Sequence, residues 1–118
     1  MDRGHINQKL QEFSNRIERI IGMFDENLTK RGAIAIEYAR LKDDLKIEKD
    51  KFQTQQGWDH ASEDERKFYS PAVEEAYIEL NARSGSSPSR KVIDNLTAAR
   101  IRISSYLDQP DYSVLNGK

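Results

Sequence analysis

Few side chains in this sequence combine a type and a spacing suited to catalysis or metal binding. The two histidines are His5, near the start of the chain, and His60, which directly follows Asp59. An imidazole beside a carboxylate can be oriented for proton transfer or can bind a metal ion, but a metal site needs further ligands at a fitting spacing. The sequence offers none near His60, so we interpret His60 as an exposed loop residue.

Adjacent carboxylates and other nucleophile patterns also favour no reaction. Acidic residues are neighbours at Asp43-Asp44, Glu63-Asp64-Glu65 and Glu74-Glu75. Neighbours on a helix point about 100° apart, so they do not form acid–base pairs. The chain has no cysteine, which excludes thiol nucleophiles, cysteine zinc sites and disulfides. We therefore expect no enzymatic activity, no catalytic residues, no cofactor and no metal.

The length and charge of the chain restrict further which class of protein it can be. The chain has 118 residues, close to the common size of one domain, and 19 basic residues balance 20 acidic ones. A neutral chain has no overall positive field to attract nucleic acid. The start lacks the apolar region of a signal peptide, and no segment approaches the roughly 20 apolar residues of a membrane span. We predict a cytoplasmic protein with no membrane partner.

A local basic strip between residues 83 and 102 supports an alternative interpretation. It contains Arg83, Arg90, Lys91, Arg100 and Arg102, against the single acid Asp94. Such a strip could contact phosphates and make the protein a small nucleic-acid-binding or regulatory helical protein. A short strip of this kind is more often a solvated helix face, so we keep nucleic acid as the alternative only.

The first helix that could position a site is indicated by a long apolar stripe. Its members recur at spacings of mostly three and four: Ile6, Leu10, Phe13, Ile17, Ile20, Phe24, Ile34, Tyr38, Leu41, Leu45 and Phe52. One heptad register covers all of them, and no proline interrupts the run, so we predict one coiled-coil-like helix over about residues 4–54 that ends before Gly57. Such a helix is roughly 75 Å long and cannot bury its stripe against itself.

Shorter helices follow. Ser62 and Glu65 form the pattern of a capping box, which predicts a helix over about 62–82. Pro71 within it indicates either a kink or a fresh start with proline in the first turn. Residues 84–88 have loop composition, a last helix is expected over about 88–107, and 109–118 should be a flexible tail. We predict an all-α protein with a single domain at 1–108, in which two shorter helices, the first kinked at Pro71, pack against the long N-terminal helix.

The stretch "LTKRGAIAIEYARL", residues 28–41, is the most unusual part of the long helix, because it is apolar on nearly every side. A row of small residues runs along one line of it, beside larger residues of the heptad stripe. The two later helices can cover only about half of the long one, and soluble monomers rarely expose an apolar seam of that size. We therefore expect a homodimer or another protein partner. The expected contact residues are Gly32, Ile34, Ala35, Tyr38, Ala39, Leu41, Leu45 and Trp58.

Two alternatives stay open at this point. The long helix could break near Gly32 and fold back as a hairpin, which would let a monomer form a closed bundle. Trp58 could plug the end of the core or could anchor a partner. In either case, the function that the pattern favours is a non-enzymatic protein–protein interaction module, such as an adaptor, inhibitor or chaperone.

Charged flanks of the stripe allow two interpretations as well. Glu37 and Asp44 precede Lys42 and Lys49 by five residues, the spacing that joins two helices in a parallel coiled coil. The simpler interpretation is a solvated face with pairing along one helix.

The segment 31–45 also resembles the first-helix motif of F-BAR domains, and the matching residues are Arg31, Ile34, Tyr38, Ala39 and Leu45. Those domains are much longer and carry a basic concave surface, which this neutral chain lacks. The resemblance therefore implies no function here.

Overall fold

The computed structural model describes residues 1–24, 31–82 and 89–107, and within these ranges the chain is helical, with no β-strand. This confirms the all-α prediction. The elements are α1 (Arg3–Met23), α2 (Arg31–Asp50), α3 (Gln55–His60), the π-helical turn η1 (Glu65–Tyr69), α4 (Ser70–Leu80) and α5 (Ser89–Ser104). The predicted loop at 84–88 and the predicted tail at 109–118 lie outside the described residues.

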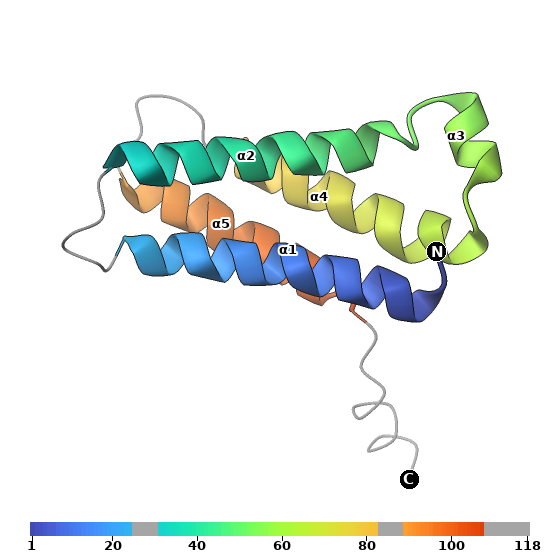
Figure 1. The fold of residues 1–118 in the computed structure, drawn as a ribbon, viewed down its shortest axis with the longest axis horizontal. Helices are drawn as coiled ribbons and strands as arrows, with labels where there is room; N and C mark the ends of the chain where they lie inside the picture. The colour runs from blue at the N-terminus through green and yellow to red at the C-terminus, as the bar shows by residue number, and fades with distance from the viewer. Residues whose placement is uncertain (25–30, 83–88, 108–118) are drawn as a thin grey trace, which may run out of the picture.

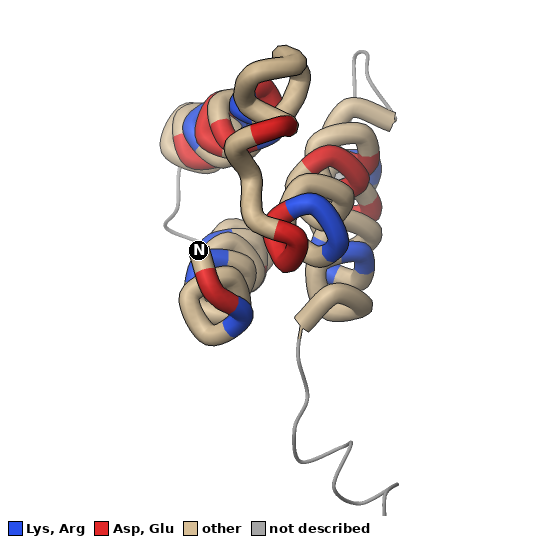
Figure 2. Tube along the Cα trace, turned by 90° about the vertical axis from the view of Figure 1, so that its right-hand side faces the viewer, with Lys and Arg blue, Asp and Glu red and all other residues tan. Residues whose placement is uncertain are grey.

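The four longer helices form an antiparallel bundle in two layers. Successive helices α1, α2, α4 and α5 run in alternating directions, and α1 and α2 lie in front of α4 and α5 (Figure 1). Seen along the bundle, the two pairs stand side by side (Figure 2). Helix α2 packs on α4, and α1 packs on α5, more closely than α1 and α2 pack on each other. The α1–α2 side is thus the loosest seam of the bundle.

The prediction of one continuous helix over 4–54 is wrong. Helix α1 ends at Met23, where the Phe24 N–H donates to the carbonyl of Ile21 at 3.1 Å, and α2 begins at Arg31 and returns beside α1. A continuous helix would leave the stripe in water. Folding back buries it, and each buried Leu or Ile contributes about 1.5–3 kcal/mol, against about 1 kcal/mol net for each helical hydrogen bond given up.

The hairpin that the sequence left as an alternative is therefore the arrangement observed. Gly32 lies in the first turn of α2 and not at the end of α1, where the helix breaks. Residues 25–30 lie outside the described part of the chain.

The buried part of the heptad stripe joins residues of α4 and α5 in the core of this bundle. Fully buried core residues come from all four longer helices and include Ile6, Leu10, Ile17, Leu41, Leu45, Val73, Ala76, Leu96, Ala99 and Ile103. The spacing of three and four was thus a correct indicator of burial. What it could not show was that the two halves of the stripe face each other instead of a second chain.

The segment before α4 combines a predicted cap with a π-helical turn. The Ser62 N–H donates to Oε1 of Glu65 at 2.7 Å and the Glu65 N–H donates to Oγ of Ser62 at 3.1 Å, which confirms the capping box. The π-helical turn then joins this cap to α4, and Pro71 occupies the first turn of α4. The predicted kink at Pro71 is not confirmed. A π-helical turn precedes this proline instead, and in it the Ser70 N–H donates to the carbonyl of Glu65.

The corner between α2 and η1 contains a short helix where a turn was expected. Thr54 caps α3, because its Oγ accepts from the Gly57 N–H at 2.9 Å. A Cβ atom on Gly57 would lie 1.9 Å from the backbone oxygen of Lys51. Gly57 is required by this close backbone approach, and it does not end a long helix as the sequence indicated.

Candidate interaction surface

Three of the predicted contact residues are inside the bundle. Ile34 is 9% exposed, and Leu41 and Leu45 are 0% exposed. The sequence predicts that they face a partner, because the later helices are too short to cover the seam of one long helix. The hairpin supplies the missing cover from α1, so these side chains are not available to a partner in this structure.

Tyr38 is also engaged within the chain. Its hydroxyl donates to the carbonyl of Leu80 at 2.5 Å, and Nδ2 of Asn95 lies 3.3 Å from the hydroxyl oxygen and 3.1 Å from the same carbonyl. Asn95 is only 3% exposed. Burial raises the pKa of the Tyr38 hydroxyl, although the hydrogen bond from Asn95 opposes this effect. These three groups form a polar lock between α2, α4 and α5.

The remaining predicted contact residues are exposed. Gly32, Ala35 and Ala39 lie on the outer side of α2. Trp58, at the α3 corner, is 40% exposed, and the Arg66 guanidinium carbon stands 5.7 Å from the centre of its ring. Arg66 also donates to the Trp58 carbonyl at 2.9 Å, so the indole is held at the surface and does not plug the core.

The structure adds a groove that sequence reasoning missed. It lies between α1 and α2 and has a volume of about 240 Å³. The residues that line it are Lys9, Glu12, Phe13, Arg16, Asp44, Ile47 and Glu48. Phe13 is nearly buried and Ile47 is 57% exposed, so the groove offers apolar surface between charged walls.

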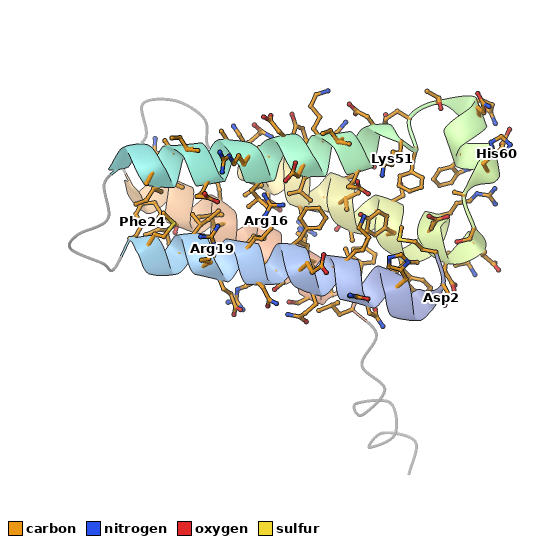
Figure 3. All side chains as sticks on the ribbon, in the orientation of Figure 1. Asp2, Arg16, Arg19, Phe24, Lys51 and His60 are labelled. Atoms are coloured by element: carbon orange, nitrogen blue, oxygen red, sulfur yellow. The ribbon has the colours of Figure 1, made fainter. Side chains whose placement is uncertain are left out.

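Ion pairs bridge this groove and its continuation. Arg16 lies 2.8 Å from Asp44, Arg19 lies 2.7 Å from Glu37, and Lys9 lies 3.7 Å from Glu48. The Arg16 and Arg19 side chains extend from α1 toward α2 (Figure 3). In each pair α1 supplies the base and α2 the acid. We call these three pairs the charge ladder.

Glu48 is the most tightly held member of the charge ladder. Burial by itself raises the pKa of its carboxyl group, but a hydrogen bond from Lys51 at 2.9 Å and one from the Tyr69 hydroxyl at 2.7 Å outweigh it, so the pKa is lowered. Tyr69 is fully buried, and burial together with the nearby Glu48 charge raises the pKa of its hydroxyl. The two groups link the groove to the core.

The sequence contains a signal for the charge ladder in the acids Glu37 and Asp44. Their spacing from Lys42 and Lys49 instead predicts flanks of a parallel coiled coil or a solvated face. In the hairpin they face Arg19 and Arg16 of the same chain. The bases beside the first half of the stripe and the acids beside its second half are complementary only if the chain folds back, so this pattern favours the hairpin.

The residues that suggested catalysis or nucleic-acid binding remain apart. His5 and His60 are exposed, with His60 at the α3 corner (Figure 3), and no three metal-ligating side chains gather anywhere in the described ranges. In the basic strip, Arg102 pairs with Glu79 at 3.0 Å and Arg100 with Glu18 at 3.8 Å. The Arg83 and Arg90 side chains lie outside the described part.

Comparison with known proteins assigns no relative. The chain matches no protein-family model, no curated protein and no solved structure. Within the described ranges, no helix has both the length and the apolar character that crossing a membrane requires. The surface of the bundle is therefore the basis for proposing a function.

Proposed function

We propose that this protein is a non-enzymatic protein–protein interaction module that binds its partner through the outer side of α1 and α2. We call this surface the α1–α2 face and define it by the groove residues together with exposed Ile36, Arg40 and Asp43 of α2. The observation that carries the proposal is the groove, where apolar Phe13 and Ile47 stand between the charged side chains of the ladder.

The physical character of the α1–α2 face supports this role. Interfaces combine an apolar centre with a charged rim, and the charges set orientation while the apolar groups supply most of the affinity. Ile36 and Ile47 are 54% and 57% exposed on one helix, and Ile47 lines the groove together with Arg16 and Asp44. The face replaces the buried seam as the proposed contact surface.

Affinity capture with matched variants tests this function. The protein is used as bait in an extract of its native cell, in parallel with Ile47→Asp and with Ile78→Asp as the control. Ile78 lies on α4 and is 56% exposed, so both changes alter one equally exposed isoleucine. We expect Ile47→Asp to lose a protein that the parent and Ile78→Asp retain, with direct binding then measured for that purified protein. Equal retention by both variants would contradict the proposal.

The nucleic-acid alternative has less support than the interaction module. Arg100 and Arg102, the described arginines of the basic strip, already face carboxylates of neighbouring helices. Absence of salt-sensitive retention on an immobilised polyanion would eliminate it. For the interaction module we propose a cytoplasmic setting, in keeping with the lack of cysteine.

A further inference from the structure

Four exposed residues on α2 form a narrow line along the outer side of the helix. They are Ile36, Arg40, Asp43 and Ile47. Their spacing of four, three and four keeps them on one face of the helix, as in a coiled-coil seam. We call this line the α2 stripe. It has an apolar residue at each end and one charge of each sign in the middle.

The α2 stripe is complementary to itself when two copies run antiparallel. A two-fold axis between positions 41 and 42 places Ile36 opposite Ile47 of a second copy. The same axis places Arg40 opposite Asp43 of the second copy, and both contacts occur twice by symmetry. We propose that the partner of the α1–α2 face is a second copy of this chain, joined through antiparallel α2 stripes. This inference rests on the proposed function, because it names the partner of that same face.

The charges at the centre of the stripe are available for such a contact. The Arg40 side chain is 70% exposed, and the only ion pair shown for it among the described residues is with Glu37 on its own helix, at 3.6 Å. Asp43 is exposed and has no ion pair with any residue in the described ranges. A parallel pairing would place Arg40 against Arg40 and Asp43 against Asp43. Like charges at these positions oppose the parallel arrangement, so the stripe selects the antiparallel one.

The other exposed isoleucines lack this pattern. Ile78 and Ile101 are 56% and 59% exposed, but each is the single exposed isoleucine of its helix within the described residues. The small side chain of Ala39, exposed beside the stripe, permits a second helix to approach closely. One pair of helices buries less than a standard interface, so we expect reversible association in the micromolar range.

Charge reversal at the centre of the stripe gives a decisive test. In Arg40→Asp, two acids face each other twice across the axis, and in Asp43→Arg two bases do so. Each single variant should weaken self-association at least about tenfold relative to the parent, as measured by sedimentation equilibrium. The double variant Arg40→Asp/Asp43→Arg should associate like the parent, because the complementary pairs are restored with their order reversed.

Mixing the two single variants provides the control against misfolding. An Arg40→Asp chain and an Asp43→Arg chain are complementary to each other, so an equimolar mixture should form a heterodimer although each alone is monomeric. A parent protein that stays monomeric at several hundred micromolar would overturn the inference. Dimers that persist in both single variants would overturn it as well.

These outcomes are distinct from those of the function test. A monomeric parent whose captured partner is lost with Ile47→Asp would disprove the second copy and keep the interaction module. A stripe-dependent dimer that captures no other protein would keep both proposals, with self-association as the interaction.

Discussion

The two sides of α2 hold the bundle together by different means. On its inner side, α2 contributes buried Leu45 to the core, and toward α4 its Tyr38 hydroxyl joins the Leu80 carbonyl and Asn95 in the polar lock. Toward α1, α2 instead contributes acids to the charge ladder, around an open groove. Burial and a desolvated hydrogen-bond network are strong and geometrically specific, whereas partly exposed ion pairs are weak and adjustable.

This difference assigns one side of α2 to the fold and leaves the other side adjustable, as the proposed binding role requires. A side fixed by buried contacts cannot open without a large loss of stability. The α1 side can rearrange at small cost, because its ion pairs are already in contact with water. Four measurements test whether the two sides differ in this way.

The largest effect is expected in the core. Leu45→Ala should lower the free energy of unfolding by about 2–5 kcal/mol, because it removes buried methyl groups and leaves a cavity. Ile47→Ala, two residues away on the same helix but exposed, should change it by no more than about 0.5 kcal/mol. Chemical denaturation followed by circular dichroism measures both. Similar losses in the two variants would show that the α1 side is not the weaker one.

The polar lock comes next. Asn95→Ala removes a donor from the Leu80 carbonyl and from the Tyr38 hydroxyl, and should cost about 1–3 kcal/mol. Asn15→Ala provides the control, since Asn15 is exposed and only accepts a hydrogen bond from Gln11. The same denaturation experiment compares them. A loss for Asn95→Ala no greater than for Asn15→Ala would mean that the network adds nothing to packing.

The pH dependence should report on Glu48 and Tyr69, which join the two sides. The pKa of Glu48 is lowered in the folded protein from 4.5, so its stabilising contribution is present above that value and is lost as the pH falls through the folded pKa. The pKa of Tyr69 is raised above 10.0, so its contribution is present below that value and is lost as the pH rises beyond it.

Variants of Glu48 and Tyr69 separate the acid and the alkaline parts of the pH dependence of the unfolding free energy. Glu48→Gln should flatten the fall of unfolding free energy on the acid side, and Tyr69→Phe should flatten it on the alkaline side, in titrations of stability against pH. Acid sensitivity unchanged in Glu48→Gln would place its origin in other carboxylates.

The smallest effect is expected for the charge ladder. A double-mutant cycle of Arg16→Ala and Asp44→Ala should give a coupling of about 0.2–1 kcal/mol, because half of the Asp44 side chain remains in water. The coupling should shrink further between low salt and about 1 M salt, where screening is strong. A coupling that is large and independent of salt would show that the α1 side is as rigid as the α4 side.

Much of the fold was readable from the sequence, and the reasons are local. The capping box at Ser62 and Glu65 and the periodic core residues follow from hydrogen-bonding groups and spacing within a few residues. The location of Gly32, Ala35 and Ala39 on the outside of the bundle does not follow from the sequence. A helical period shows which residues share a face but not what that face meets.

For the same reason, most of the candidate interaction surface could not be predicted from the sequence. Phe13 and Ile47 lie far apart along the chain and become neighbours only when α2 folds back on α1. The α2 stripe is visible in the sequence as an alternation of apolar and charged residues, but its exposure depends on the rotation of α2 about its axis. Burial of Leu41 and Leu45 on the opposite side sets that rotation.

The residue pattern is enough to predict that the chain is helical, which residues form the apolar stripe and where the capping box lies. These properties depend on hydrogen bonds and spacings within one or two helical turns. The three-dimensional packing is needed to show that the stripe closes on itself in a bundle, that the seam from Ile34 to Leu45 is internal, and that Ile36 and Ile47 are left outside. The physical reason is that burial of apolar surface is non-directional: the same stripe is satisfied by a second chain or by its own other half, and only the three-dimensional packing distinguishes them.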